Sequence, residues 1–362
     1  NPYIDLDGIP CTKERRRVAR DNTVQYRQRT LQLFPDADRV SYAGAYVEIL
    51  EPPHPGQNIA ARGEDARAGE VVLGPGRLLN GPALSLAAGT GRERLRVYPL
   101  PEVALLQTGG ELLEPGAPAA ENKIYNSNTA LLVGLINDVR IARSRCLGLC
   151  PDEPARLSRA VRQGLESNVL VLTGGISQGD FDFVPQVLRD CGVELLFQGA
   201  SIKPGRPLLF GRGGRESFVF GLPGNPVSTL VCFHEFVVPL LRRLAGLKGP
   251  SGNADLSATL TRGVSNKRGR SFICPAYISV SSGRLWAHPL PGHGSGDYVT
   301  AARANGVVIV PLEMTRLEAG AEATVHLWGV APPAGPDGEA PSESSQSPRV
   351  ETDIGSIQRP IT

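Results

Sequence analysis

The sequence predicts a multidomain chain of the α/β plus β class, with a central, mostly parallel α/β sheet domain flanked by two small β domains. Three apolar strands, near 102–107, 168–172 and 218–220, each end in a polar loop that contains glycine, and helical segments lie between them. Alternation of this kind implies right-handed crossovers and a mostly parallel sheet. On either side, short apolar runs are separated by Gly and Pro, which is typical of small β domains.

Length and charge narrow the classes of function. The chain has 362 residues and is 41% hydrophobic, which is enough for two or three domains. Lys and Arg together number 38 against 36 for Asp and Glu, a net charge of +2 that gives no reason to expect a nucleic-acid or membrane partner. No apolar run reaches the roughly 18 residues that span a bilayer, and no secretory signal precedes the core. We therefore expect a cytoplasmic protein.

The two ends of the chain differ from the middle. Residues 1–35 form an unassigned basic arm, with seven basic and two acidic residues between Lys13 and Arg29. A solvated arm is the main interpretation, and a basic patch for an anionic partner is the alternative. Residues 331–362 are rich in Pro, Ser and Glu, so we expect a disordered tail.

The first expected β domain covers residues 36–100. Its strands are predicted at 46–50, 70–73 and 94–98. Glu64 and Asp65 form a carboxylate pair that fits a solvated turn better than a set of metal ligands.

The central α/β domain is expected over residues 101–248. Helices are predicted at 127–138, after Asn126 as a cap, and at 153–167, with apolar residues four apart. Further strands are predicted at 141–147 and 195–201, and the third apolar strand is predicted to extend over 218–221.

The turn from Gly221 to Ser228 joins the third strand to a helix that runs to Leu244. Asn225 can act as the N-cap, and Pro226 suits the first helical position because its missing N–H costs nothing there. The turn would then present unpaired amides at a positive helix end, where an anion fits. A tight connection with no further role is the alternative. In an open parallel sheet all three glycine loops would lie at the carboxyl edge, where ligands bind.

Charged side chains accompany these loops. Lys203 and Arg206 surround Pro204-Gly205, and the prolines of this block hold both cations in a rigid loop that suits a tetrahedral dianion. The Ser228 hydroxyl could donate to the same anion. Asp180 and Asp182 could hold Mg²⁺, but the residues alone favour helix capping.

The second β domain is expected over residues 252–330, with strands at 256–261, 271–280, 307–311 and 324–327. Arg270 would lie at a strand edge, where an arginine is usually a surface residue. The six dispersed cysteines suit packed, reduced thiols. Cys146 and Cys150 lack a second pair of ligands for zinc, and His234 fits a packed position inside a helix.

Three segments together resemble one family. Residues 172–182, 203–207 and 221–228, the last with Leu-Pro-Gly-Asn-Pro-Val-Ser, look like the molybdopterin molybdenumtransferases, which include the gephyrin E domain. Order and spacing match from about Gly56 to Val330. The resemblance implies a central domain of the molybdopterin-binding type and insertion of molybdenum from molybdate into adenylylated molybdopterin, with Mg²⁺ and release of AMP. It also implies a homodimer with the active site near the subunit interface.

The resemblance also implies roles for individual residues. The catalytic residues would be Asp180, Asp182 and Glu111, and the metal ligands would be the same three with Asp152. The substrate-binding residues would be Thr108, Gly109, Thr173, Gly174, Gly175, Ser177, Gly179, Pro223, Gly224, Asn225 and Pro226. The molybdate-binding residues would be Lys203, Arg206, Pro207, Ser228 and Arg270.

This chain departs from the family pattern in three places. Gly110 stands where most relatives have Asp, and Arg206 stands where Lys is common. The N-terminal Pro-Phe-Asp-Asn-Ser-Ala-Met-Asp-Gly-Tyr-Ala and Met-Thr-Gly-Ala-Pro motifs are not found, and we expect a fragment because the sequence starts at Asn1. Two alternatives stay open: a molybdopterin adenylyltransferase, and a non-catalytic molybdopterin-binding or scaffold protein.

Overall fold

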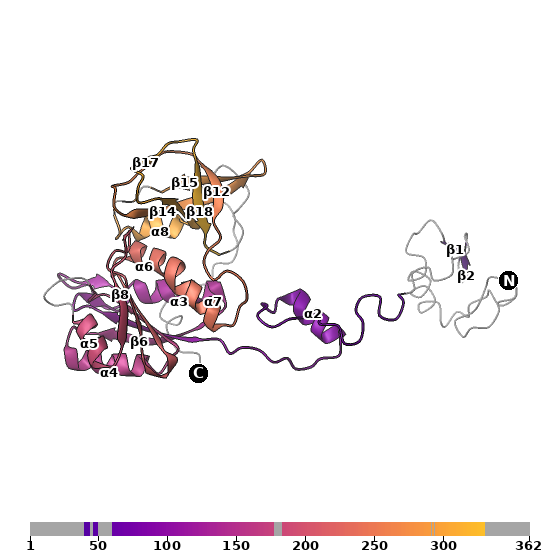
Figure 1. The fold of residues 1–362 in the computed structure, drawn as a ribbon, viewed down its shortest axis with the longest axis horizontal. Helices are drawn as coiled ribbons and strands as arrows, with labels where there is room; N and C mark the ends of the chain where they lie inside the picture. The colour runs from indigo at the N-terminus through magenta and orange to yellow at the C-terminus, as the bar shows by residue number, and fades with distance from the viewer. Residues whose placement is uncertain are drawn as a thin grey trace. The chain divides into compact units, whose positions relative to one another are not determined.

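The computed structural model describes residues 40–43, 46–49, 60–176, 183–290, 292 and 294–329, and the chain divides after Gly74 into two units. In the first unit, strands β1 (Val40–Ala43) and β2 (Tyr46–Ile49) pair antiparallel (Figure 1). Glu64 accepts a hydrogen bond from the Ala61 amide at 2.6 Å in an exposed turn, as the sequence predicts. The strand predicted at 70–73 is wrong: these residues have no strand conformation, and Val71 is 80% exposed, so no layer covers it.

The second unit opens with helix α2 (Gly81–Gly89), capped by the Asn80 side chain, which accepts from the Ala83 amide. The strand predicted at 94–98 is also wrong. The ring of Tyr98 lies against Gly246 after the last helix of the central domain, but Leu95, Val97 and Tyr98 are all exposed, so this run is an irregular surface segment that pairs with no strand.

A mixed sheet forms the centre of this unit. Its strands, in spatial order, are β6 (Arg143–Cys150), β3 (Glu102–Thr108), β7 (Val169–Thr173), β11 (Phe218–Leu222), β10 (Leu209–Arg212) and β8 (Glu194–Gln198). The first four run parallel, and β10 is antiparallel to both of its neighbours. The mostly parallel α/β sheet is thus confirmed. Sequence reasoning missed β10, a four-residue strand between Pro207 and Gly213.

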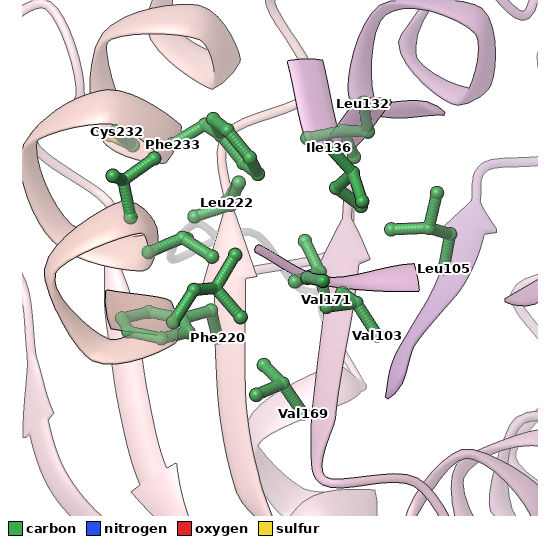
Figure 2. Packing of buried hydrophobic residues seen from close by; sticks show 14 of the residues in the cluster. Val103, Leu105, Leu132, Ile136, Val169, Val171, Phe220, Leu222, Cys232 and Phe233 are labelled. Carbon is green, nitrogen blue, oxygen red and sulfur yellow. The ribbon is translucent and has the colours of Figure 1, made fainter. Parts of the chain in front are cut away.

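Helices cover both faces of this sheet (Figure 1). One face is covered by helix α3 (Asn128–Val139) and by a second, longer helix. This second helix is continuous and consists of α6 (Pro226–Cys232), the π-helical turn η5 (Phe233–Val237) and α7 (Val238–Leu244). Helices α4 (Pro154–Gly164) and α5 (Val184–Asp190) lie on the other. Figure 2 shows the first face, where α3 and the π turn pack on the middle strands.

The strand residues alternate between the two cores. Val103 and Leu105 enter the core shown in Figure 2, whereas Ala104 and Leu106 enter the opposite one. All four are at most 1% exposed. Each fully buried Val or Leu contributes about 1.5–3 kcal/mol, so the middle strands are held from both sides.

The N-terminus of α3 is capped as predicted. Asn126 Oδ1 accepts from the Thr129 amide at 3.2 Å, and Asn126 Nδ2 donates to Thr129 Oγ1 at 2.8 Å. Both Asn126 and Thr129 are buried, so this cap is part of the polar layer beneath the sheet edge.

The C-terminal domain is a β domain whose main strands pair in a closed cycle. Its strands are β12 (Leu256–Leu260), β14 (Ser271–Ser281), β15 (Arg284–Pro289), β16 (Gly306–Val310) and β18 (Glu322–Leu327), together with a small pair, β13 (Val264–Ser265) and β17 (Arg316–Leu317). The pairing of β14 with β15 closes the cycle. A short helix, α8 (Tyr298–Arg303), is capped by Asp297.

One strand ties the two domains together. Strand β9 (Ile202–Lys203) lies in the chain of the central domain but pairs parallel with β14, with Ile202 opposite Ser271 and Lys203 opposite Phe272. The loop that carries Lys203 and Arg206 is therefore fixed to the β domain. Among the helices of the described residues, none is long and apolar enough to cross a membrane.

Candidate active site

The three glycine loops meet at one edge of the central sheet. Strands β3, β7 and β11 are neighbours and run parallel, so their carboxyl ends lie side by side. The Gly174 amide donates to the Leu222 carbonyl at 3.3 Å, which joins the second loop to the third. Gly174 has φ +91°, and a Cβ there would overlap the Thr108 carbonyl oxygen, so only glycine lets the first and second loops approach this closely.

The side chain of Asn128 links the third loop to the end of β7. Its Nδ2 donates to the Gly224 carbonyl at 2.7 Å and to Thr173 Oγ1 at 3.4 Å. Asn128 is the first residue of α3 and is 7% exposed, and its Oδ1 is buried without a hydrogen-bond partner in the described part of the chain. Sequence reasoning missed this residue because a polar side chain at a helix start is usually only a cap.

Asp152 braces the first loop. Its Oδ1 accepts from Thr108 Oγ1 at 2.5 Å, and its Oδ2 accepts from the Gly110 amide at 3.1 Å. The carbonyl of Gly110 accepts from Lys123 Nζ. The Glu111 carboxylate folds back over Gly109, since a Cβ built there would lie 2.7 Å from both of its oxygens. The hydroxyl of Thr108 therefore stabilises the first loop through its hydrogen bond to Asp152.

The third turn does not match the predicted capping. Asn225 occupies the N-cap position, but its side chain makes no capping hydrogen bond, and that part of the prediction is wrong. Its Nδ2 donates to Ser295 Oγ at 2.7 Å, and the Val227 amide donates to the Ser295 carbonyl at 3.0 Å. The prediction that the turn presents unpaired amides is wrong for Val227, because a loop of the β domain accepts the hydrogen bond of this amide.

A cavity of about 330 Å³ opens beside this turn, between the central domain and the β domain. The three cations Lys203, Arg206 and Arg270 line it, although they come from two separate segments. Hydroxyl groups of Ser228, Ser295 and Thr300 are also among the lining residues. No carboxylate is among the residues that line this cavity in the described part of the chain, although Asp297 accepts a hydrogen bond from the lining residue Thr300 at 2.7 Å, so the charged lining residues are the three cations.

The cations are held by the fold. Lys203 lies on β9, and its Nζ lies 4.9 Å from the centre of the Phe272 ring. Gly205 has φ +107°, and a Cβ there would lie 2.6 Å from Cys232 Sγ, so the loop presses against helix α6. Cys232 is fully buried, and its burial raises the pKa of the thiol to about 12. It therefore packs as a neutral group beneath the loop.

The predicted site residues thus fall into two neighbouring groups joined by the third turn. Thr108, Gly109, Glu111, Asp152, Thr173, Gly174 and Gly175 lie in or beside the first two loops. Lys203, Arg206, Pro207, Pro223, Asn225, Ser228 and Arg270 line the cavity. Gly224 and Pro226 belong to the turn between them. Ser177, Gly179, Asp180 and Asp182 lie outside the described residues.

A polar cluster joins the two domains at the far end of helix α6. His326 Nδ1 contacts Glu235 Oε2 at 2.7 Å, and His326 Nε2 contacts Asp255 Oδ1 at 2.9 Å. Both ring nitrogens must carry protons to donate to two carboxylates, and these hydrogen bonds, first that to Glu235, raise the pKa of His326. Glu235 also accepts from Trp328 Nε1 at 3.2 Å.

His234 is packed, as the sequence predicts. Its ring stacks on Trp328 with centroids 4.5 Å apart, and it is 7% exposed. Burial, with a smaller effect of Arg242, lowers its pKa to about 3, so the ring stays neutral. It lines a second, largely apolar cavity between α3, α6 and α8.

The described residues alone do not complete the predicted Mg²⁺ site. Among them, no three His, Cys, Asp or Glu side chains come together to hold a metal ion. Both oxygens of Asp152 already accept hydrogen bonds, and Gly110 offers no carboxylate. Asp180 and Asp182, the other predicted ligands, lie outside the described residues.

Two family models match the two domains. "Probable molybdopterin binding domain" matches residues 104–243, and "MoeA C-terminal region (domain IV)" matches residues 257–328. A molybdopterin molybdenumtransferase of Haemophilus influenzae is 33% identical over 289 residues, which are 78% of this chain and 71% of that protein. The chain belongs to the molybdopterin molybdenumtransferase family.

Other members of the family are similar to this chain in sequence and in structure. The molybdopterin molybdenumtransferase of Synechocystis is 29% identical over 80% of this chain and 72% of its own length. The crystal structure of the molybdopterin biosynthesis MoeA protein from Pyrococcus horikosii superposes with a TM-score of 0.66 at 27% identity, covering 81% of this chain and 71% of that one. A molybdopterin molybdenumtransferase fold, with a mostly parallel α/β domain and a C-terminal β domain, is therefore established for this chain.

Proposed function

We propose that this chain transfers molybdenum from molybdate into adenylylated molybdopterin and releases AMP. Membership of the family supports the proposal. The observation that carries it is the cavity in which Lys203, Arg206 and Arg270 converge with hydroxyl groups and with no carboxylate among the described lining residues. Such a lining suits a small tetrahedral dianion, because fixed cations and hydroxyl donors stabilise its charge without reorganising.

The third turn links the cavity to the glycine edge of the sheet, which supports a substrate that spans both. Asn225 lines the cavity, while Gly224 of the same turn is bonded through Asn128 to the end of β7. In this proposal the phosphate and adenylate of the substrate occupy the glycine edge, and its metal-receiving end enters the cavity. Catalysis is then mainly positioning and charge neutralisation around a departing phosphate.

The assay for this function measures AMP. Purified chain is incubated with adenylylated molybdopterin, with and without molybdate, and AMP is quantified. Molybdate-dependent release supports the transferase. Binding of the substrate without release indicates the scaffold alternative, and adenylylation of molybdopterin by ATP indicates the adenylyltransferase alternative.

We also propose that the chain forms a homodimer, on the resemblance to related enzymes alone. Analytical ultracentrifugation of the full chain tests this, and a single species at the 38.5 kDa mass of one chain would contradict it.

A further inference from the structure

The second cavity, between helices α3, α6 and α8, is separate from the cavity that contains the three cations. Its volume is about 370 Å³, and none of the described residues lines both cavities. Helix α8 contributes to each of them, because Thr300 lines the first and Ala301 lines the second. The proposed function makes no use of the second cavity.

The walls of the second cavity are mainly apolar. Leu131, Leu135 and Val139 line it from α3, where they are four residues apart and share one side of the helix. Leu230 of α6 and Ala301 of α8 also line it. An apolar cavity of about 150 Å³ in another protein holds benzene. At about 370 Å³, this cavity has room for two fused rings.

His234 is the buried polar side chain of this lining. It is 7% exposed, and its ring nitrogens make no hydrogen bond with a described residue. Neither nitrogen is among the side-chain atoms that protein atoms enclose completely, so both keep some open surface. The stacking of the ring on Trp328, with centroids 4.5 Å apart, fixes its plane. A polar group is thus held in a set orientation with its hydrogen bonds unused.

The chemistry of His234 selects the kind of group it can bind. Burial, with a smaller effect of Arg242, lowers its pKa to about 3, so the imidazole is neutral and offers one acceptor nitrogen and one N–H. Among the described lining residues Asp138 is the charged one, and it is exposed on α3. The cavity therefore disfavours anions, in contrast to the cavity of Lys203 and Arg270.

We propose that the second cavity is a binding site for a neutral, planar heteroaromatic molecule of about two fused rings, whose ring N–H donates to His234. The apolar walls from α3, α6 and α8 would contact the faces and edges of the rings. A mainly apolar cavity with few fixed polar groups is the usual form of a site for such molecules. This ligand is distinct from both anionic substrates of the proposed function.

The test uses indole as the probe and the full chain as the protein. Calorimetry measures the affinity for indole and for indole-3-acetate, which adds a carboxylate to the same ring. We expect saturable binding of indole, and binding of indole-3-acetate that is weaker by about threefold or more, because its charge faces Asp138 and no cation. Tighter binding of indole-3-acetate, or displacement of indole by molybdate, would place the probe in the cationic cavity and overturn the proposal.

His234→Phe tests the hydrogen bond. The variant keeps a ring against Trp328 but removes the acceptor nitrogen, so indole affinity should fall by about two- to tenfold. Unchanged affinity in a variant that melts like the wild type would refute the role of His234 and the class of ligand inferred from it.

Two leucine substitutions on α8 test the location. Ala301→Leu puts a larger side chain into the cavity and should abolish indole binding. Val299→Leu is the matched control, since Val299 is 54% exposed and lines neither cavity, and it should bind indole like the wild type. A wild type that binds no indole, or Ala301→Leu that binds it at full strength, would refute the site.

Discussion

The ammonium of Lys203 lies over the ring of Phe272, with Nζ 4.9 Å from the ring centre, and the two residues are opposite each other in the pairing of β9 with β14. This contact fixes a cation of the central domain by a residue of the β domain. The cavity between the domains therefore depends on both of them for its charge.

Replacing Phe272 should loosen this cation. In Phe272→Leu the apolar volume is largely kept but the ring is lost, and a cation–π contact contributes about 0.5–2 kcal/mol. We expect molybdate affinity, measured by calorimetry, to fall by about two- to thirtyfold. Phe272→Tyr keeps the ring and should bind molybdate like the wild type, so an equal loss in both variants would contradict this role of the ring.

Gly174 should tolerate no side chain. In Gly174→Ala a Cβ would overlap the Thr108 carbonyl in a backbone with φ +91°, so we expect a loss of at least about 2 kcal/mol in the free energy of unfolding, measured with urea. Gly224→Ala is the matched control on the adjacent loop. A Cβ there would meet only the Gly174 Cα at 3.8 Å, so its stability should stay within about 0.5 kcal/mol of the wild type. Equal stability of the two variants would refute the close approach of the loops.

Ser295 should contribute through its side chain to the contact between the two domains. In Ser295→Ala the hydrogen bond from Asn225 Nδ2 is lost, while the Ser295 carbonyl still accepts from the Val227 amide. We expect a loss of about 0.5–1.5 kcal/mol in unfolding free energy. If the double variant Asn225→Ala/Ser295→Ala is less stable by the full sum of the two single losses, the pair is not coupled.

Stability should fall with rising pH through His326. Its pKa is raised above 6.5 by hydrogen bonds to Glu235 and Asp255, so the stabilising contribution of the imidazolium is fully present below pH 6.5 and is lost as the pH rises through the folded-state pKa. We expect the melting-temperature advantage of the wild type over His326→Gln to shrink between about pH 5 and pH 8.

His288 provides a control of opposite sign. Burial, with a smaller effect of Arg262, lowers its pKa, so the wild type should gain stability relative to His288→Gln as the pH rises toward 6.5. If the advantage over His326→Gln stayed constant across this pH range, the charged contact would not contribute.

Much of the fold follows from local signals in the sequence. Strands β3, β7 and β11 are continuous apolar runs that end in Gly-containing loops, and both cores bury them fully, so their pattern predicts them well. The strands predicted at 70–73 and 94–98 had a similar apolar content. They failed because strand formation needs a partner strand, and the sequence does not show where that partner is.

The site residues likewise include some that the sequence predicts and some that it does not. Lys203, Arg206 and Arg270 could be predicted from charges in rigid loops and from the family resemblance, and the structure brings them to one cavity. The contact of Asn225 with Ser295 could not be predicted, because 70 residues separate them in the chain. Lys123 and Asn128 were missed because their contacts, to the Gly110 carbonyl and across the sheet edge, exist only after folding.

The most direct measurement of the central claim is a calorimetric titration of the full chain with molybdate, comparing the wild type with Arg270→Gln. Arg270 is an exposed residue that lines the cavity and forms no ion pair with a described residue, so its loss should not unfold the protein. We predict saturable molybdate binding by the wild type and a loss of about tenfold or more in the variant, with an unchanged melting temperature. Wild-type binding that Arg270→Gln keeps at full strength would show that molybdate binds elsewhere and would contradict the account.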